Sequence, residues 1–242
     1  MNKDVLFGVH AVREWLTADP KRILAVMALP NPNDRVRRVL QRAQEAGVPI
    51  EEISRDALTR IAGPRNAQGI AARVAPFPFK DLDTVLADAG PSPMILVADG
   101  VTDPVNMGGI LRNAAFFGVS AVLLPRDRSA ALSPVVERTA AGAAARVPIC
   151  RENSLLRSIE SLKERGFRVF ASVVGGHPLP KTHDLSGPIV LMVGSEGKGL
   201  RPSLRRVADG KTSLPSFGPG SLNVAAFTSV LLYEACRQRT VD

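Results

Sequence analysis

The second half of the chain repeats one pattern, in which a short and mostly apolar run is followed by a stretch with helical spacing. Apolar strands without polar alternation are buried on both faces, which is typical of a parallel sheet covered by helices. Ligands bind such sheets beyond the carboxyl ends of the strands. The expected strands cover residues 94–98, 121–124, 147–149, 168–174 and 189–193, and the expected helices 106–117, 133–145 and 155–165.

The first 75 residues also alternate between helical and extended patterns, which predicts a separate α/β unit. The Pro-rich run at 75–80 and the breaker at 90–93 interrupt this alternation and indicate a linker. We therefore expect a first domain over 1–75, a linker over 76–93 and a second domain over 94–242. In the first domain, helices are expected at 9–16, 34–46 and 56–61, and strands at 23–28, 49–53 and 69–74.

A loop at 99–112 follows the first strand of the second domain. Asn106 is expected to cap the next helix, because its side chain can accept a free backbone N–H of the first turn. Arg112 then falls among apolar residues. Such an arginine either extends to solvent or binds an anion or a carboxylate.

A glycine-rich loop at 193–200 follows a buried strand, but its spacing is not that of a phosphate-binding P-loop. Glu196 in this loop would repel phosphate, and its carboxylate suits a cation, a hydroxyl or an arginine. Arg112 is the candidate partner. The alternative is a plain glycine turn that carries a surface glutamate.

The third loop, at 214–223, is broken by two prolines and two glycines and precedes an apolar helix. Ser221 is expected to be the N-cap of that helix. A helix that is apolar on nearly every face is buried or lies at an interface. Asn223 carries an amide at the start of this helix, where it requires hydrogen-bond partners.

Composition narrows the functional classes. The 242 residues carry a formal charge of +8, which favours a polyanion such as nucleic acid, although a generally basic surface gives the same total. Four arginines lie in one predicted helix, which either binds RNA or is a solvated face. These residues are Arg35, Arg37, Arg38 and Arg42.

Several other classes lack support. His10, His177 and His183 do not have the spacing of metal ligands, and Cys150 and Cys236 suit neither a disulfide framework nor a metal site. Dinucleotide and serine-hydrolase motifs are missing from the strand–helix junctions. The chain has no apolar run of about 18 residues and no apolar signal core, so we expect a cytoplasmic protein without a metal.

The three loops together resemble the signature motifs of the SpoU/TrmH family, which are RNA ribose 2′-O-methyltransferases with the knotted SPOUT fold. The matching pieces are residues 103–115, 193–200 and 214–224. Residues 7–12 and 67–72 also resemble the L30e-like substrate-binding domain of the 23S rRNA guanosine-2′-O-methyltransferase branch.

This resemblance implies an L30e-like α/β domain, followed by a SPOUT domain with a mainly parallel sheet and a deep trefoil knot. It implies a homodimer through the C-terminal domain, and S-adenosylmethionine bound in the knot near Gly194, Leu214 and Leu222. The implied substrate is 23S rRNA; the alternatives are tRNA and a non-catalytic RNA-binding or ribosome-assembly role. The implied catalytic cluster consists of Asn106, Arg112, Glu196, Ser221 and Asn223. In this cluster Arg112, oriented by Glu196, would either contact an RNA phosphate or take the proton of the ribose hydroxyl.

Overall fold

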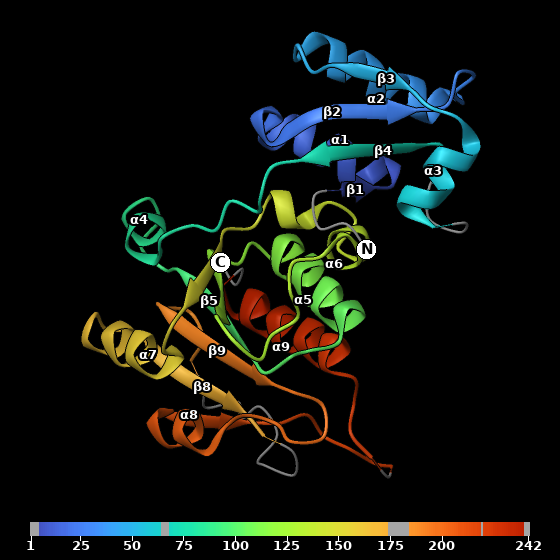
Figure 1. Cartoon of the computed structure of the whole chain (residues 1–242). Helices are drawn as coiled ribbons and strands as arrows, with labels where there is room; N and C mark the ends of the chain where they lie inside the picture. The colour runs from blue at the N-terminus through green and yellow to red at the C-terminus, as the bar shows by residue number, and fades with distance from the viewer. Residues whose placement is uncertain (1–4, 64–67, 174–183, 219, 240–242) are drawn as a thin grey trace. The chain divides into compact units, whose positions relative to one another are not determined.

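The computed structural model describes residues 5–63, 68–173, 184–218 and 220–239, so His177 and His183 lie outside the described residues. The chain forms two compact units (Figure 1). The first contains residues 1–78 and 132–146, and the second contains residues 79–131 and 147–242. The segment 132–146 therefore packs with the N-terminal unit although it lies within the sequence of the C-terminal one.

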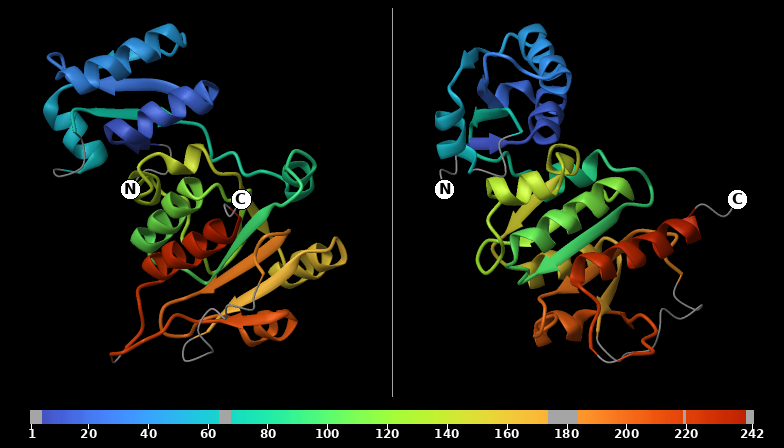
Figure 2. Two further views of the ribbon diagram at one scale, coloured as in Figure 1. Left: turned by 180° about the vertical axis from the view of Figure 1, so that it is seen from behind. Right: turned by 90° about the vertical axis from the view of Figure 1, so that its right-hand side faces the viewer.

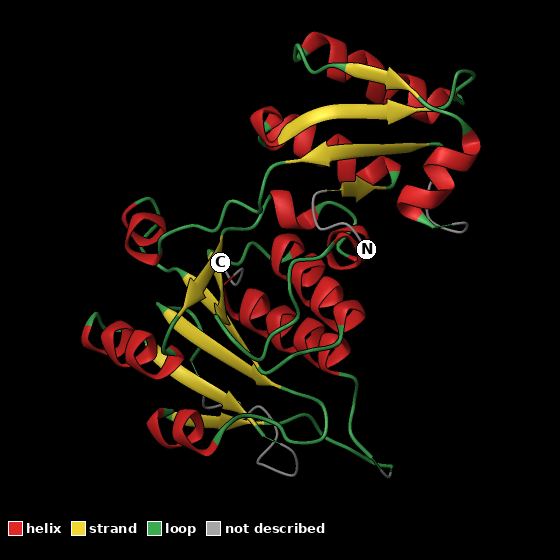
Figure 3. Ribbon diagram, viewed as in Figure 1, coloured by secondary structure: helices red, strands yellow, loops and turns green. Residues whose placement is uncertain are grey.

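The first unit is built on a mixed four-stranded sheet (Figure 3). Strand β4 pairs antiparallel with β1 and β2, and β3 pairs parallel with β2. Alternate strand residues face opposite sides, so Leu6 packs with helices α1 and α2, whereas Val5 and Phe7 pack with α3. The elements are β1 (Val5–Phe7), α1 (Val9–Ala18), η1 (Pro20–Arg22), β2 (Ile23–Ala28), α2 (Asp34–Glu45), β3 (Ile50–Glu52), α3 (Arg55–Ala62) and β4 (Ile70–Val74).

The helix expected over 133–145 is interrupted, so that prediction is wrong. Helix α6 (Pro134–Thr139) ends, and a 3-10 turn, η2 (Ala143–Ala145), follows. Between them Ala141 and Gly142 have φ values of 52° and 83°, which a right-handed helix excludes. A Cβ on Gly142 would lie 2.4 Å from Cγ of Glu14, so glycine permits the close approach of this turn to α1.

Glu137 of α6 is held in the first unit by a buried ion pair. Its carboxylate accepts hydrogen bonds from Nη1 and Nη2 of Arg22, both at 2.7 Å, and from Nε1 of Trp15 at 2.6 Å. The Arg22 guanidinium also lies 4.0 Å from the centre of the Trp15 ring. Because both charges are hydrogen-bonded, the cost of burying them is offset.

The second unit contains a parallel six-stranded sheet with the strand order β10-β8-β9-β5-β6-β7. The strands expected at 94–98, 121–124, 168–174 and 189–193 are present, and β9 lies between β8 and β5 (Figure 2). The strand expected at 147–149 lies later, at 149–152, and β10 was not expected. The strands are β5 (Met94–Asp99), β6 (Ala121–Pro125), β7 (Ile149–Glu152), β8 (Arg168–Ser172), β9 (Ile189–Gly194) and β10 (Gly210–Thr212).

Helices cover both faces of this sheet. Helices α4 (Leu82–Ala87), α7 (Leu155–Glu164) and α8 (Pro202–Val207) pack on one face. On the other face, α5 (Pro104–Phe116) packs along α9 (Val224–Arg239). A Cβ on Gly109 would lie 2.9 Å from Cβ of Ala225, so the two helices approach closely at this glycine. One face of α9 is buried, but Val230 and Tyr233 are exposed, so the prediction that this apolar helix is buried or lies at an interface stays open between its two parts. Of the helices described, none is long and apolar enough to cross a bilayer.

Candidate functional site

The candidate site lies at the carboxyl ends of the two central strands. Strands β5 and β9 pair in parallel, with Asp99 opposite Gly194. The loops that follow these strands therefore leave the sheet side by side. The segment before α9 completes the site, because Ser221, Leu222 and the glycine loop after β9 line one cavity.

Helix α5 begins two residues earlier than expected, and Asp103 is its N-cap. The Asp103 Oδ1 atom accepts hydrogen bonds from the backbone N–H of Val105 at 2.6 Å and of Asn106 at 3.1 Å. The prediction that Asn106 caps this helix is therefore wrong. Pro104 occupies the first helical position, which suits proline because that position needs no N–H donor. The side chain of Asn106, which is buried, is left for other partners.

Helix α9 is capped by Asn223, so the prediction that Ser221 is its N-cap is also wrong. The Asn223 Oδ1 atom accepts hydrogen bonds from the N–H groups of Ala225 at 2.9 Å and Ala226 at 3.3 Å. Asparagine and serine are about equally good N-caps, so residue type did not discriminate between the two positions. Ser221 is exposed and lies before the helix, where it lines a cavity.

Three side chains from the three loops form one hydrogen-bonded cluster. The Glu196 Oε1 atom accepts hydrogen bonds from Nδ2 of Asn106 at 2.6 Å and from Nδ2 of Asn223 at 3.1 Å. The Asn223 Nδ2 group also donates to Oδ1 of Asn106 at 2.7 Å. Each residue contacts the other two, which orients the carboxylate. Within the described residues, Oε2 of Glu196 accepts no hydrogen bond and is left for a ligand.

The glycine loop after β9 folds back on itself and requires glycine at its first position. Ser195 and Gly199 form an isolated antiparallel bridge, and Gly197 and Gly199 have φ values of 82° and 64°. A Cβ on Gly194 would lie 2.2 Å from both the carbonyl carbon of Gly199 and the nitrogen of Leu200. These are backbone atoms that cannot move aside without opening the loop.

A cavity of about 600 Å³ lies between this loop and the start of α9. Gly194 and Leu222, two of the predicted cofactor contacts, line it together with Ser221, Glu196 and the half-buried Phe227. Leu214, the third predicted contact, is half-buried and is not among the lining residues. The cofactor roles of these residues stay predictions.

A second cavity of about 590 Å³ shares residues 195, 196 and 198–200 with the first, so Glu196 lines both. In its wall, the Asp99 carboxylate is 3% exposed and forms an ion pair with Arg201 at 2.8 Å. Neither Asp99 nor Arg201 was predicted from the sequence to belong to the site. Their positions at the end of β5 and just after the glycine loop were the available signal.

Arg112 does not contact the cluster through a hydrogen bond. It lies on α5 six residues after Asn106, which places it about 120° around the helix axis from Asn106. Its side chain is exposed and has no hydrogen bond or ion pair with any described residue. The expected pairing of Arg112 with Glu196 is therefore not present, because Arg112 lies on another side of α5 from Asn106, and two asparagine amides take the place of the arginine at Oε1 of Glu196.

Two family models match the chain. Residues 93–233 match the SpoU rRNA methylase family. Residues 5–80 match the model for RNA 2′-O ribose methyltransferase substrate binding. The two matches confirm the predicted fold class, an α/β substrate-binding domain before a methyltransferase domain with a mainly parallel sheet. The threading of the knot stays a prediction.

Two relatives that match over the full length of the chain have the same enzyme name. The chain is 37% identical over 251 residues to the 23S rRNA (guanosine-2′-O-)-methyltransferase RlmB of Photobacterium profundum, with 100% of both chains covered. It is 40% identical over 252 residues to the protein of that name from Vibrio cholerae, again with 100% of both covered.

Solved structures agree with this fold. The SpoU methyltransferase AviRb of Streptomyces viridochromogenes, in complex with AdoMet, has a TM-score of 0.81 at 22% identity, covering 97% of this chain and 90% of that one. An AdoMet-bound rRNA methyltransferase of Sinorhizobium meliloti has a TM-score of 0.78 at 25% identity, covering 98% and 88%.

Proposed function

Because this chain belongs to the SpoU rRNA methylase family, we propose that it transfers a methyl group from S-adenosylmethionine to a ribose 2′-hydroxyl of RNA. The proposed target is a guanosine of 23S rRNA, the substrate in the names of its full-length relatives. The observation that carries the proposal is the convergence of Asn106, Glu196 and Asn223 beside the cavity at Gly194.

The cavity of about 600 Å³ suits this cofactor, since small-molecule sites occupy roughly 300–1,000 Å³. Leu222 and Phe227 supply apolar surface for an adenine ring, and the loop from Gly194 supplies backbone donors and acceptors. Lys198 and Arg205 in the lining can pair with a carboxylate. When bound, S-adenosylmethionine supplies an electrophilic methyl carbon on a sulfonium centre.

The polar cluster would position the ribose for attack on that carbon. A 2′-hydroxyl is a weak nucleophile and needs a group that accepts its proton as the new bond forms. We assign this role to Oε2 of Glu196, because the amides of Asn106 and Asn223 fix the carboxylate through Oε1. Holding hydroxyl and methyl carbon in contact lowers the barrier further.

Arg112 would bind an RNA phosphate next to the target ribose. Guanidinium groups match phosphate oxygens in geometry and are too basic to accept a proton easily. The exposed position of Arg112, on the helix that carries Asn106, supports this role. Ser221, at the rim of the cofactor cavity, would contact either the cofactor or the ribose.

The N-terminal domain, expected over 1–75, would bind the RNA substrate. The second domain would form a homodimer through α5 and α9, which expose large apolar side chains although they pack against each other. As an enzyme that modifies ribosomal RNA, this protein would act in the cytoplasm, and its reaction would need no metal. The exposed large apolar residues on α5 and α9 are Val105, Phe116, Val230 and Tyr233.

Methyl transfer from labelled S-adenosylmethionine to unmodified 23S rRNA tests the proposal, with unmodified tRNA as the competing substrate. We expect label in 23S rRNA, on a guanosine ribose. Gly194→Ala should reduce transfer and cofactor binding by at least about 100-fold, because the added Cβ meets backbone 2.2 Å away. Gly187→Ala is the matched control, since a Cβ there meets nothing within 4 Å.

Three results would contradict parts of this proposal. Label in tRNA alone would refute the 23S rRNA assignment. RNA binding without methyl transfer would favour the non-catalytic alternative. Normal turnover of an Arg112→Ala variant at saturating cofactor and limiting RNA would exclude the role assigned to Arg112.

A further inference from the structure

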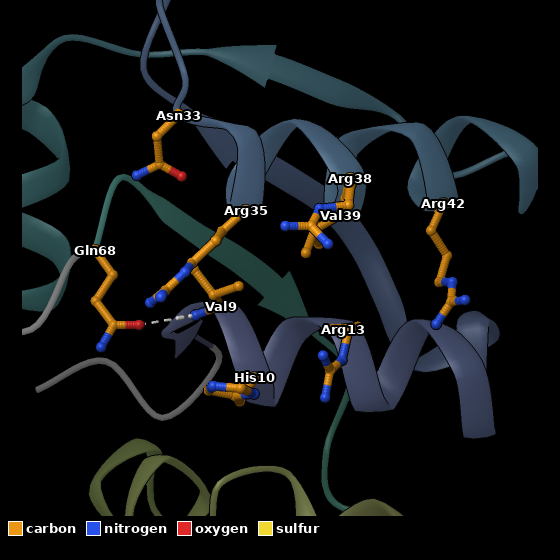
Figure 4. A pocket seen from close by; sticks show the side chains of 9 residues that line it. All are labelled: Val9, His10, Arg13, Asn33, Arg35, Arg38, Val39, Arg42 and Gln68. Carbon is orange, nitrogen blue, oxygen red and sulfur yellow. Dashed lines mark hydrogen bonds between the residues drawn. The ribbon is translucent and has the colours of Figure 1, made fainter.

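Helices α1 and α2 of the first unit form a groove that is lined by cationic side chains. The cavity between them has a volume of about 780 Å³ (Figure 4). Arg35, Arg38 and Arg42 line it from α2, and His10 and Arg13 line it from α1. Val9 and Val39 also line it, and Asn33 and Gln68 complete the wall. The four guanidinium groups come from two helices, so the groove is a property of the fold and not of one charged stretch.

The polar groups of this groove are almost entirely hydrogen-bond donors. The Asn33 Oδ1 atom accepts from Val36 N–H at 3.1 Å, and Oε1 of Gln68 accepts from Val9 N–H at 3.2 Å. Their NH₂ groups therefore remain as donors, and neither has an acceptor among the described residues. Arginine has donors only, and some of them are already used: Arg13 pairs with Glu14 at 2.8 Å, and Arg42 donates to Oγ1 of Thr17 at 2.8 Å. The Nη1 and Nη2 groups of Arg35 and Arg38 have no acceptor among the described residues. Among the nine residues that line the groove, none is a carboxylate. A ligand rich in acceptor oxygens matches this lining.

The arginines of α2 divide into two groups. Residues 35, 38 and 42 recur at spacings of three and four and so share one helix face. Arg37 lies on another face, where it pairs with Asp34 at 2.9 Å and does not line the groove. The sequence interpretation that placed all four arginines together is therefore refined to three arginines of α2, joined by Arg13 of α1.

We propose that this groove binds the phosphodiester backbone of the RNA substrate. From Arg35 to Arg42 the rise along α2 is about 10 Å, which matches roughly three phosphates of one strand. The lining contains no Phe, Tyr or Trp, and the His10 imidazole is its one ring on which a base could stack. The groove therefore positions the RNA and contributes affinity with little base preference. This inference rests on the proposed RNA substrate but does not depend on methyl transfer.

The test measures the affinity of the full-length protein for unmodified 23S rRNA at several salt concentrations. The variant Arg35→Gln/Arg38→Gln/Arg42→Gln should bind at least about tenfold more weakly at low salt. The slope of log K against log salt should fall in magnitude by about 2, since each lost phosphate contact removes about 0.7–0.9. Binding of S-adenosylmethionine alone, measured by calorimetry, should be unchanged.

Two control variants distinguish the effect of the groove arginines from the effect of positive charge elsewhere on the first unit. Lys21→Gln/Arg37→Gln/Arg60→Gln removes the same charge from exposed positions of the first unit outside the groove, and its salt slope should match the wild type. The charge-conserving Arg35→Lys/Arg38→Lys/Arg42→Lys variant should keep most of the slope. If both glutamine triple variants lower the slope equally, or neither does, the groove proposal is wrong. Methyl transfer by the wild type in the same preparation decides the proposed function separately.

Discussion

Each unit of the protein contains a glutamate that accepts hydrogen bonds from distant parts of the chain, and the two glutamates differ in the residues that surround them. Glu137 in the first unit accepts three hydrogen bonds, two of them from Arg22, and is 3% exposed. Glu196 in the second unit is exposed and accepts two hydrogen bonds, both from uncharged amides on Oε1. The first carboxylate is neutralised and enclosed, whereas the second keeps a free oxygen.

This difference separates a stabilising cluster from a reactive one. An enclosed ion pair has no capacity left for a ligand, and its contribution is to hold α6 in the first unit. A carboxylate held by uncharged amides has no opposite charge paired with it and keeps one acceptor atom at a cavity wall. The two clusters should therefore respond in opposite ways when each carboxylate is replaced, one in stability and the other in catalysis.

The largest effect is expected from Glu137→Ala. It leaves the Arg22 charge buried without a partner and should lower the free energy of unfolding by about 3–5 kcal/mol. Urea denaturation at pH 7 measures this change. The control is Glu51→Ala, which removes the half-exposed pair with Arg73 and should cost no more than about 1 kcal/mol.

Equal losses in these two variants would mean that burial does not set the energy of the Glu137 cluster. The double replacement Arg22→Met/Glu137→Met provides a second check. Apolar residues of similar length remove both charges, and this variant should recover much of the stability that Glu137→Ala loses.

The next largest effect is expected from Glu196→Gln, and it concerns rate. The amide keeps an oxygen for the donors of Asn106 and Asn223 but cannot accept the ribose proton, so turnover should fall by about 100-fold or more. Stability should change by less than about 1 kcal/mol, because the side chain is exposed. Single-turnover methyl transfer to 23S rRNA measures the rate.

Measuring both variants in both assays sharpens the comparison. Glu137→Ala, assayed well below its melting temperature, should keep normal turnover, since the mechanism gives Glu137 no role. A Glu196→Gln enzyme that turned over normally would exclude Glu196 as the proton acceptor. The amide cluster would then position groups without taking part in the reaction.

Most of the fold could be predicted from the sequence, because apolar runs and helical spacing report burial directly. The strands expected at 23–28 and 94–98 appear as β2 and β5 within one residue. The wrong predictions concern positions where local sequence rules allow two different residues to have the same role. A serine and an asparagine both suit the start of α9, and the residue that caps the helix depends on contacts with Asn106 and Glu196.

The site was predictable to the extent that its residues follow strands. Gly194 is the last residue of β9, and Glu196 lies in the loop that follows. The rule that parallel sheets bind ligands at the carboxyl ends of their strands therefore identifies both residues. The partner of Glu196 was not predictable. Arginine is the partner expected from charge, but the structure uses two amides, and only the paired register of β5 and β9 makes Asn106 the neighbour. Long-range packing of this kind leaves no signal in local spacing.

The smallest effect concerns Glu234 on α9, which has as many donors as Glu137 but is only partly buried, with 21% of its side chain exposed. Arg237 Nε and Nη2 and Gln238 Nε2 each donate to it at 2.8 Å, and hydrogen bonds first from Arg237 and then from Gln238 lower its pKa to about 2. A lowered pKa stabilises the fold at pH values above the unfolded pKa near 4.5, and this stabilisation is lost as the pH falls through 4.5 toward 2.

Solvent screening should limit this stabilisation to about 0.5 kcal/mol. The free energy of unfolding of Glu234→Gln should therefore be lower than that of the wild type by this amount at pH 7 and equal to it near pH 2. Urea denaturation across this range, with the exposed and unpaired Glu160→Gln of α7 as control, measures the difference. A loss comparable to that of Glu137→Ala would show that the number of donors, and not burial, distinguishes these glutamates.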